Sequence, residues 1–227
     1  MNNWERAIDK VYNGKYDRLP DVLFGEVPLN IFNWLKSEAE KSKEKNMDYR
    51  KTLAGHINEE YNIMQSDNTS PFIEYENFIK RCAFSEYFED FWARTNILTR
   101  ACDLKIVSTW ANFQKKYEFN PPHDHSGLFS WIIFLNIPYN LEDEDRVFPA
   151  LDVGDEGIRR PTTSRLSFAK VCYNRRSGID HVILDVDKSF ERKILVFPSY
   201  LQHQVFPFYT SDDYRITISG NAFFKIS

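Results

Sequence analysis

The chain has 227 residues, which is enough to bury one full hydrophobic core. Hydrophobic residues make up 42% and charged residues 27%, a composition typical of globular proteins that argues against wholesale disorder. The formal net charge of −4 offers no basic surface for nucleic acid or an anionic membrane, and no apolar run approaches the length of a membrane span.

The first hundred residues have a helical texture. Apolar side chains spaced from Leu29 onward predict a helix, followed by a charged, solvated tail to about Lys45. The segment 58–64 is too short to assign. Gln65–Ser70 is rich in polar turn formers and predicts a loop. Apolar residues recur at three-to-four spacing across Phe72–Thr99, which predicts one or two helices.

After Ala101 the hydrophobic period changes to two, which is the period of a strand. The apolar run Phe129–Pro138 predicts a central strand, and the acidic segment Pro138–Pro149 predicts a solvated loop. Further strands are predicted at Ile106–Gln114, Leu166–Tyr173, His181–Val186, Lys193–Phe197, His203–Phe208 and Tyr214–Phe224. Many short strands separated by turn signals indicate a mainly-β fold. We expect one domain over 1–227, with a helical part (about 1–100) before a jelly-roll barrel (about 101–227).

Two of the five histidines stand one residue apart in the segment NPPHDHSG. On a strand, residues i and i+2 point to the same face, so His123 and His125 can present two imidazoles to one point. His203 follows the short apolar strand KILVF, at the rigid end of which a ligand is well placed. These three histidines are the candidate metal ligands and catalytic residues.

A positively charged residue follows His203 in the sequence. Arg215 comes 12 residues after His203, and Thr217 shares its face of the last predicted strand. The planar fork of an arginine binds a carboxylate through two hydrogen bonds, and a nearby hydroxyl adds another. Arg215, Thr217 and Asn112 are therefore the candidate residues for an anionic cosubstrate, although Asn112 is equally well explained as an ordinary solvent-facing polar residue.

These pieces together resemble the 2-oxoglutarate/iron(II)-dependent oxygenase superfamily, and within it the phage-type oxygenases. The matching stretches are WANFQKKYEFNPPHDHSGLFSW, ILVFPSYLQHQVFPF and DDYRITISGN, from about Trp110 to Asn221, with a weak echo in LAGHINEEY. The resemblance implies a double-stranded β-helix of the cupin-like kind. It also implies iron(II), 2-oxoglutarate and O2 as cofactor and cosubstrates, with hydroxylation as the usual outcome.

The sequence departs from that superfamily at one ligand. The usual pattern is His-x-Asp/Glu before the distal histidine, and His125 stands here where the carboxylate is expected. Three alternatives are open. His125 binds the metal directly, or it lies next to the ligands without binding while water completes the site. In the third alternative, a local bulge rotates Asp124 toward the metal. A three-histidine dioxygenase that uses no 2-oxo acid is the second enzymatic hypothesis, and Arg215 argues against it. A non-catalytic barrel that serves as a binding module is the third.

Simpler interpretations apply to other residues. His56 and His181 are expected to be structural, and Arg215 could instead pair with a neighbouring aspartate on the surface. The three cysteines, Cys82, Cys102 and Cys172, are expected to be reduced. No signal peptide is visible, so we expect a cytoplasmic protein (the host cytoplasm, if phage-encoded). The expected partner is a small molecule or a peptide or protein side chain, with nucleic acid disfavoured. The helical part suits either packing on the barrel or a homodimer contact.

Overall fold

The computed structural model describes residues 21–63, 69–94, 103–152, 158–159, 161–171 and 178–225. Its helices are α2 (Leu29–Glu44), α3 (Ser70–Ala83), α4 (Glu89–Arg94) and α5 (Leu141–Val147), with 3-10 turns at Arg50–Thr52, Glu86–Phe88 and Lys188–Phe190. Its strands are β1 (Leu23–Glu26), β2 (Glu60–Asn62), β3 (Asp103–Gln114), β4 (Asn120–His123), β5 (Phe129–Asn136), β6 (Leu151–Asp152), β7 (Ile158–Arg159), β8 (Leu166–Val171), β9 (Ile179–Leu184), β10 (Lys193–Pro198), β11 (His203–Val205) and β12 (Arg215–Lys225).

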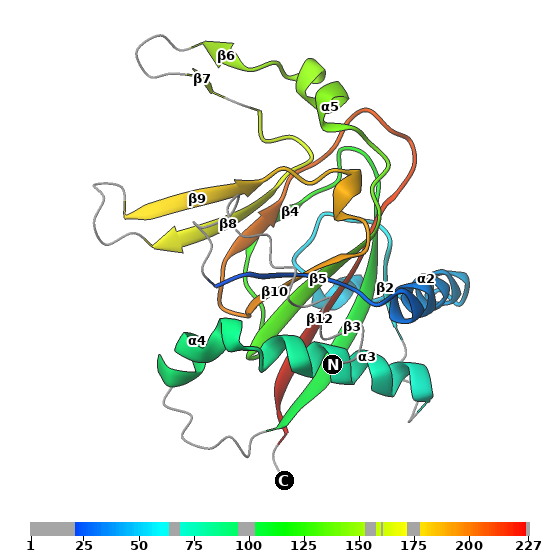
Figure 1. Cartoon of the computed structure of the whole chain (residues 1–227). Helices are drawn as coiled ribbons and strands as arrows, with labels where there is room; N and C mark the ends of the chain where they lie inside the picture. The colour runs from blue at the N-terminus through cyan, green and yellow to red at the C-terminus, as the bar shows by residue number, and fades with distance from the viewer. Residues whose placement is uncertain are drawn as a thin grey trace.

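Two antiparallel sheets form the body of the described structure (Figure 1). The larger has six strands in the order β1-β10-β5-β12-β3-β2, and the smaller has four in the order β4-β11-β8-β9. Non-sequential neighbours in both sheets show that the chain crosses between them, as in a jelly roll. The fold is therefore mainly β with N-terminal helices, as the sequence predicts.

The N-terminal helices cover the outer face of the larger sheet, on the side away from the smaller one (Figure 1). Their buried faces, including Leu35 on α2 and Tyr75 and Phe78 on α3, join one hydrophobic cluster with Trp131 and Ile133 of β5. The indole N–H of Trp131 donates to the hydroxyl of Tyr75 at 2.8 Å, which satisfies both buried polar groups.

A second cluster fills the space between the two sheets. Ile132 and Phe134 of β5 point away from the helices and meet Phe168 of β8, Leu184 of β9 and Phe197 of β10. Strand β5 is apolar on both faces because it separates these two cores, which explains its nearly continuous apolar run. Ile132, Phe134 and Leu166 of this core also line a cavity between the sheets, together with polar side chains of the larger sheet.

Three local predictions need correction. The acidic segment expected as a loop contains helix α5, whose first turn carries three acidic residues, the sign that the helix dipole favours there. Glu144 of that helix is buried and accepts hydrogen bonds from the backbone of Tyr209 and Thr210. The charged tail after Leu35 is the continuing helix α2, and Pro198 lies within β10.

The front part of the chain is not only helical, because β1 and β2 add the two edge strands of the six-stranded sheet. Cys82 is a buried free thiol, whereas Cys102 and Cys172 lie outside the described residues. The end of the expected helical stretch Phe72–Thr99 also falls outside them. None of the described helices is long and apolar enough to cross a membrane.

Candidate functional site

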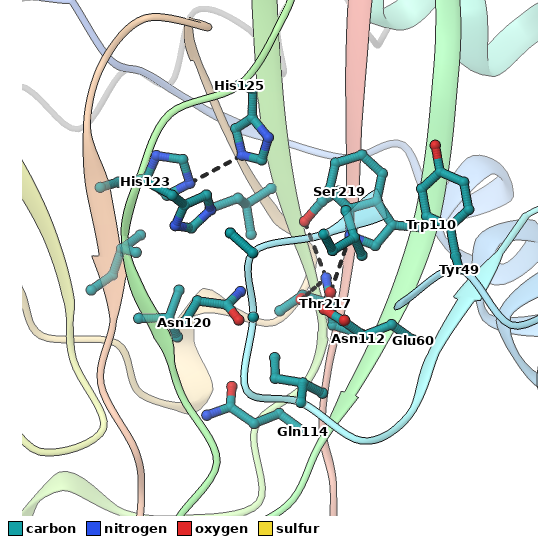
Figure 2. Close-up of a pocket in the computed structure, with 18 of the residues that line it drawn as sticks. Tyr49, Glu60, Trp110, Asn112, Gln114, Asn120, His123, His125, Thr217 and Ser219 are labelled. Carbon is teal, nitrogen blue, oxygen red and sulfur yellow. Dashed lines mark hydrogen bonds between the residues drawn. The ribbon is translucent and has the colours of Figure 1, made fainter. Parts of the chain in front are cut away.

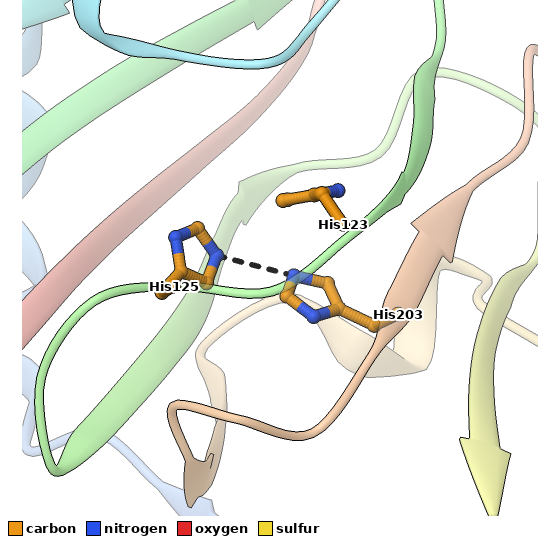
Figure 3. Close-up of side chains that lie close together, drawn as sticks. All are labelled: His123, His125 and His203. Atoms are coloured by element: carbon orange, nitrogen blue, oxygen red, sulfur yellow. Dashed lines mark hydrogen bonds between the residues drawn. The ribbon is translucent and has the colours of Figure 1, made fainter.

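Three histidines from two neighbouring strands and the loop after one of them converge at a single point (Figure 3). His123 ends β4 and His203 begins β11, and the two residues are direct partners in the antiparallel pairing. Their ring centroids are 4.3 Å apart, and each lies 5.0 Å from the ring of His125. One nitrogen from each ring lies within 4.8 Å of the others, the spacing of a metal-binding group.

Backbone carbonyls orient two of the three rings. Nδ1 of His123 lies 2.7 Å from the carbonyl oxygen of Pro121, and Nδ1 of His203 lies 3.1 Å from that of Leu201. A carbonyl can only accept, so Nδ1 carries the proton in both rings and Nε2 keeps its lone pair for a ligand bond. Metal-binding histidines are commonly oriented by such an N–H to carbonyl bond.

His125 is held differently. The expected strand ends at His123, and His125 lies just beyond it, where its backbone N–H donates to the carbonyl of Ser199 at 2.9 Å. Gly127, with φ of +124°, turns the chain there, and a Cβ at this position would lie 3.0 Å from the backbone oxygen of Ala222. Nε2 of His125 lies 3.3 Å from Nε2 of His203, close to the ~3 Å that two ligands at right angles need at bond lengths of about 2.1 Å.

The histidines are neutral near pH 7. Burial, with a smaller effect of the neighbouring His123 in the same direction, lowers the pKa of His125 to about 4. Burial also lowers the pKa of His123, and burial together with the other two rings holds the pKa of His203 well below its usual range. Neutral imidazole is the form that binds a metal, so the donor set fits a divalent cation such as iron(II).

A cavity of about 230 Å³ extends from the histidines into the barrel (Figure 2). Polar side chains of three adjacent strands line it, with Asn112 and Gln114 on β3, Thr217 on β12 and Glu60 on β2. In the sheet, Glu60 is paired with Asn112 and Asn112 with Thr217, so these three residues form one row across the cavity wall. Asp124 also lines the cavity but is not part of the converging histidine group.

Arg215 lies inside the barrel and is 3% exposed. It pairs with neither neighbouring aspartate, and its five N–H groups reach neutral acceptors only: Gln114 twice, the hydroxyl of Tyr139 and the carbonyls of Ser164 and Phe206. Among the described residues, no carboxylate lies within ion-pair distance of Arg215. All five donors have acceptors within the protein, but the positive charge has no carboxylate partner among the described residues, which makes Arg215 a candidate counter-charge for an anion in the cavity.

Asn112 belongs to the same wall. Its amide group donates to the hydroxyls of Thr217 and Ser219, and its carbonyl oxygen accepts from the indole of Trp110. Asn112 is buried, so it is not the solvent-facing residue that the sequence left equally open. Thr217 also lies on the cavity face of β12, two residues from Arg215.

The chain matches the model of a known protein family. The family model described as "Putative 2OG-Fe(II) oxygenase" matches residues 108–221, which contain all three histidines and Arg215. The chain belongs to the 2OG-Fe(II) oxygenase family. Membership implies that this oxygenase uses iron(II) as its cofactor and 2-oxoglutarate and O2 as cosubstrates. A comparison with curated proteins gave no match.

Solved structures agree with the fold of this oxygenase. A prolyl-4-hydroxylase from Pseudomonas putida is 11% identical with a TM-score of 0.54, and the match covers 99% of each chain. A 2OG-Fe(II) oxygenase family protein from Burkholderia pseudomallei is 11% identical with a TM-score of 0.47, over 90% of this chain and 85% of that one. At these identities the likeness shows the jelly-roll fold alone.

Sequence reasoning missed the wall that the N-terminal part contributes. Tyr49, residues 52–55, Ile57, Glu60 and Asn120 all line the cavity, and no sequence pattern identified them as site residues. The only signal was the weak echo LAGHINEEY, which includes Gly55 and Glu60. His181 lies away from the cavity on β9, and His56 stacks on Phe119 with ring centroids 4.8 Å apart, in keeping with structural roles.

Proposed function

We propose that this oxygenase hydroxylates an organic substrate with iron(II), 2-oxoglutarate and O2. His123, His125 and His203 hold the metal, and Arg215 with Thr217 binds the far carboxylate of 2-oxoglutarate. The observation that carries the proposal is the pairing of a converging, neutral histidine group with a buried arginine that lacks a counter-anion in one cavity. A dicarboxylic 2-oxo acid would bridge these two features.

The chain's own residues bind and orient the reactants. The carbonyls of Pro121 and Leu201 hold two imidazoles with their lone pairs inward, and Arg215 supplies the positive end of the cavity. Bound iron(II) supplies oxygen activation, which is coupled to conversion of 2-oxoglutarate to succinate and CO2 and to insertion of one oxygen atom into a substrate C–H bond. The aromatic side chains around His203, including Phe168 and Phe197, keep water away from the buried side of that ligand.

Anaerobic calorimetry tests the proposal. Titration of 2-oxoglutarate into iron(II)-loaded protein should give micromolar-range binding, and the metal-free protein should bind much more weakly. Admission of oxygen should then yield succinate. Absence of 2-oxoglutarate binding to the metal-loaded protein would contradict the proposal.

The second candidate is a three-histidine dioxygenase that uses no 2-oxo acid. The presence of His125 in the converging group favours it, because the described ligand group contains no carboxylate. The inward position of Arg215 favours the 2-oxoglutarate enzyme, because a dioxygenase without that cosubstrate has no need of an uncompensated cation in the barrel. Calorimetry with 2-oxoglutarate therefore separates the two.

A further inference from the structure

A buried acid faces the cavity from the edge strand. Glu60 is 1% exposed and lines the cavity, and its Oε2 atom has no hydrogen-bond partner. A buried polar atom without a partner costs free energy, and nearly all such atoms in folded proteins are satisfied. The unpaired oxygen of Glu60 therefore marks a place for a ligand group that donates a hydrogen bond.

A second acceptor without a partner belongs to Asn120, whose side chain lies near that of Glu60. The Oδ1 atom of Asn120 is buried and makes no hydrogen bond. A Cβ atom built on Gly55 would lie 2.1 Å from Oδ1 of Asn120 and 3.3 Å from Oε1 of Glu60, so both side chains approach the same point above the glycine. Two neighbouring side chains, each with one oxygen that lacks a donor, suit a group that carries several N–H bonds.

Aromatic faces complete this wall (Figure 2). The rings of Tyr49 and Trp110 lie 5.9 Å apart, and both line the cavity. The backbone N–H of Tyr49 donates to the carbonyl of Glu60 at 2.9 Å, which keeps the two residues together. Aromatic faces beside a carboxyl group are favourable surroundings for an organic cation.

The wall reaches the candidate metal centre through Trp110, whose ring centroid lies 5.8 Å from that of His125. A molecule bound along Glu60 and Trp110 would therefore extend toward the histidines. Arg215 lies on the third strand of the sheet from that edge, on β12, so the cavity offers a cation for one ligand and an acid for another. Two oppositely charged ligands can then bind side by side.

The protonation of Glu60 is compatible with both ligands. Burial, with the carboxylates of Glu118 and Asp48 acting in the same direction and the guanidinium of Arg50 against it, raises the pKa of Glu60 to about 7. Near pH 7 the acid is therefore ionised in only about half of the molecules, so it repels an anionic cosubstrate less than a fully ionised carboxylate would. A cation beside it would stabilise the ionised form and release the proton.

We propose that Glu60, together with Asn120 and the aromatic faces of Tyr49 and Trp110, binds an ammonium or guanidinium group of the substrate. The substrate is then an amine- or guanidine-bearing molecule whose cationic end lies at β2 and whose oxidised carbon lies near His125. This inference rests on the proposed function, because it assigns the second ligand of the same cavity. The family match covers residues 108–221, so Tyr49 and Glu60 lie outside it.

Calorimetry on nickel(II)-loaded protein saturated with 2-oxoglutarate tests this assignment without turnover. The probes are n-butylammonium, n-butylguanidinium and the neutral n-butylurea. We expect at least one cation to bind about tenfold or more tightly than the urea. The Glu60→Gln variant keeps the shape of the side chain and should lose that preference. Glu142→Gln, at a side chain that is 90% exposed on α5, is the matched control and should keep it.

Proton release is an independent readout in the wild-type protein. Titrations in buffers of different ionisation enthalpy should show nearly one proton released per cation bound at about pH 6, and almost none at about pH 8.5. Equal affinity for the cations and the urea, or a preference that persists in Glu60→Gln, would overturn the assignment. Failure of 2-oxoglutarate to bind at the loading step would instead overturn the proposed function and this inference together.

Discussion

Replacement of Arg215 by methionine separates the charge of this residue from its packing. The guanidinium carbon lies 5.8 Å from the ring centroid of Tyr139 and 5.6 Å from that of Phe208. Methionine fills a similar volume between these rings but carries no charge and donates no hydrogen bond. Arg215→Met should therefore remove the anion site while leaving the barrel folded.

The expected loss of affinity follows from the burial of the guanidinium. Loss of one partner from a buried, hydrogen-bonded ion pair costs roughly 2–5 kcal/mol. If the variant loses about 3 kcal/mol of binding free energy for the contact between one carboxylate and Arg215, the dissociation constant of 2-oxoglutarate should rise by about 100-fold. The side-chain oxygen of Gln114 and the carbonyl of Phe206 lose their donors at ~1–3 kcal/mol each, whereas the carbonyl of Ser164 keeps the hydroxyl of Tyr139. The removal of an uncompensated buried charge offsets part of that cost. We expect a net destabilisation of about 2 kcal/mol.

The assay is titration of 2-oxoglutarate into metal-loaded wild type and variant, after urea unfolding shows that both are folded. Arg146→Met is the control, because that side chain is 72% exposed on α5 and does not line the cavity. The control should bind 2-oxoglutarate as the wild type does. Binding to Arg215→Met within about threefold of the wild type would refute the assignment of this residue to the cosubstrate.

Three further predictions concern single side chains. His125→Ala should weaken cobalt(II) binding by at least about tenfold and change the cobalt absorption spectrum, and an unchanged spectrum would mean that His125 is not a ligand. Glu144→Gln should lower the free energy of unfolding in urea by about 2 kcal/mol, because an amide cannot accept every bond that Tyr209 and Thr210 donate to this carboxylate, and wild-type stability would contradict that. The pKa of Glu60 is about 7 in the folded protein against an ordinary 4.5, so the folded state holds an extra proton between these values and loses stability as the pH rises through them. Relative to Glu60→Gln, the wild type should lose about 3 kcal/mol between about pH 4 and pH 8, and a constant difference would argue against a buried acid.

The barrel and the histidines could be predicted because their signals are local in sequence. Alternation along β3 and β12 indicates strands. The sequence also marks His123 and His125 as a pair, but the reason expected for their convergence is wrong, because β4 ends at His123 and the backbone bond from His125 to Ser199 holds the second histidine. The meeting of His123 with His203 depends on the pairing of β4 with β11. No periodicity encodes which strands pair, so only the family resemblance indicated it.

Other features depend on tertiary contacts that a sequence pattern does not contain. The acidic run around Glu144 looks like a solvated loop until the backbone of Tyr209 and Thr210 is found donating to it. Glu60 lies in a segment too short to assign, and its importance comes from the pairing of β2 with β3, which turns its side chain into the barrel. An edge strand of three residues carries almost no pattern of its own.

The position of β2 also bears on how such an enzyme can diversify. This strand is joined to the sheet along one side only, and the polypeptide before it returns to the barrel through His56 and Phe119. Residues 48–62 carry Tyr49 and Glu60 but none of the three histidines and not Arg215. If Glu60 binds the substrate as proposed, changes in this one segment would alter the choice of substrate, while the residues proposed for the oxidative chemistry stay the same.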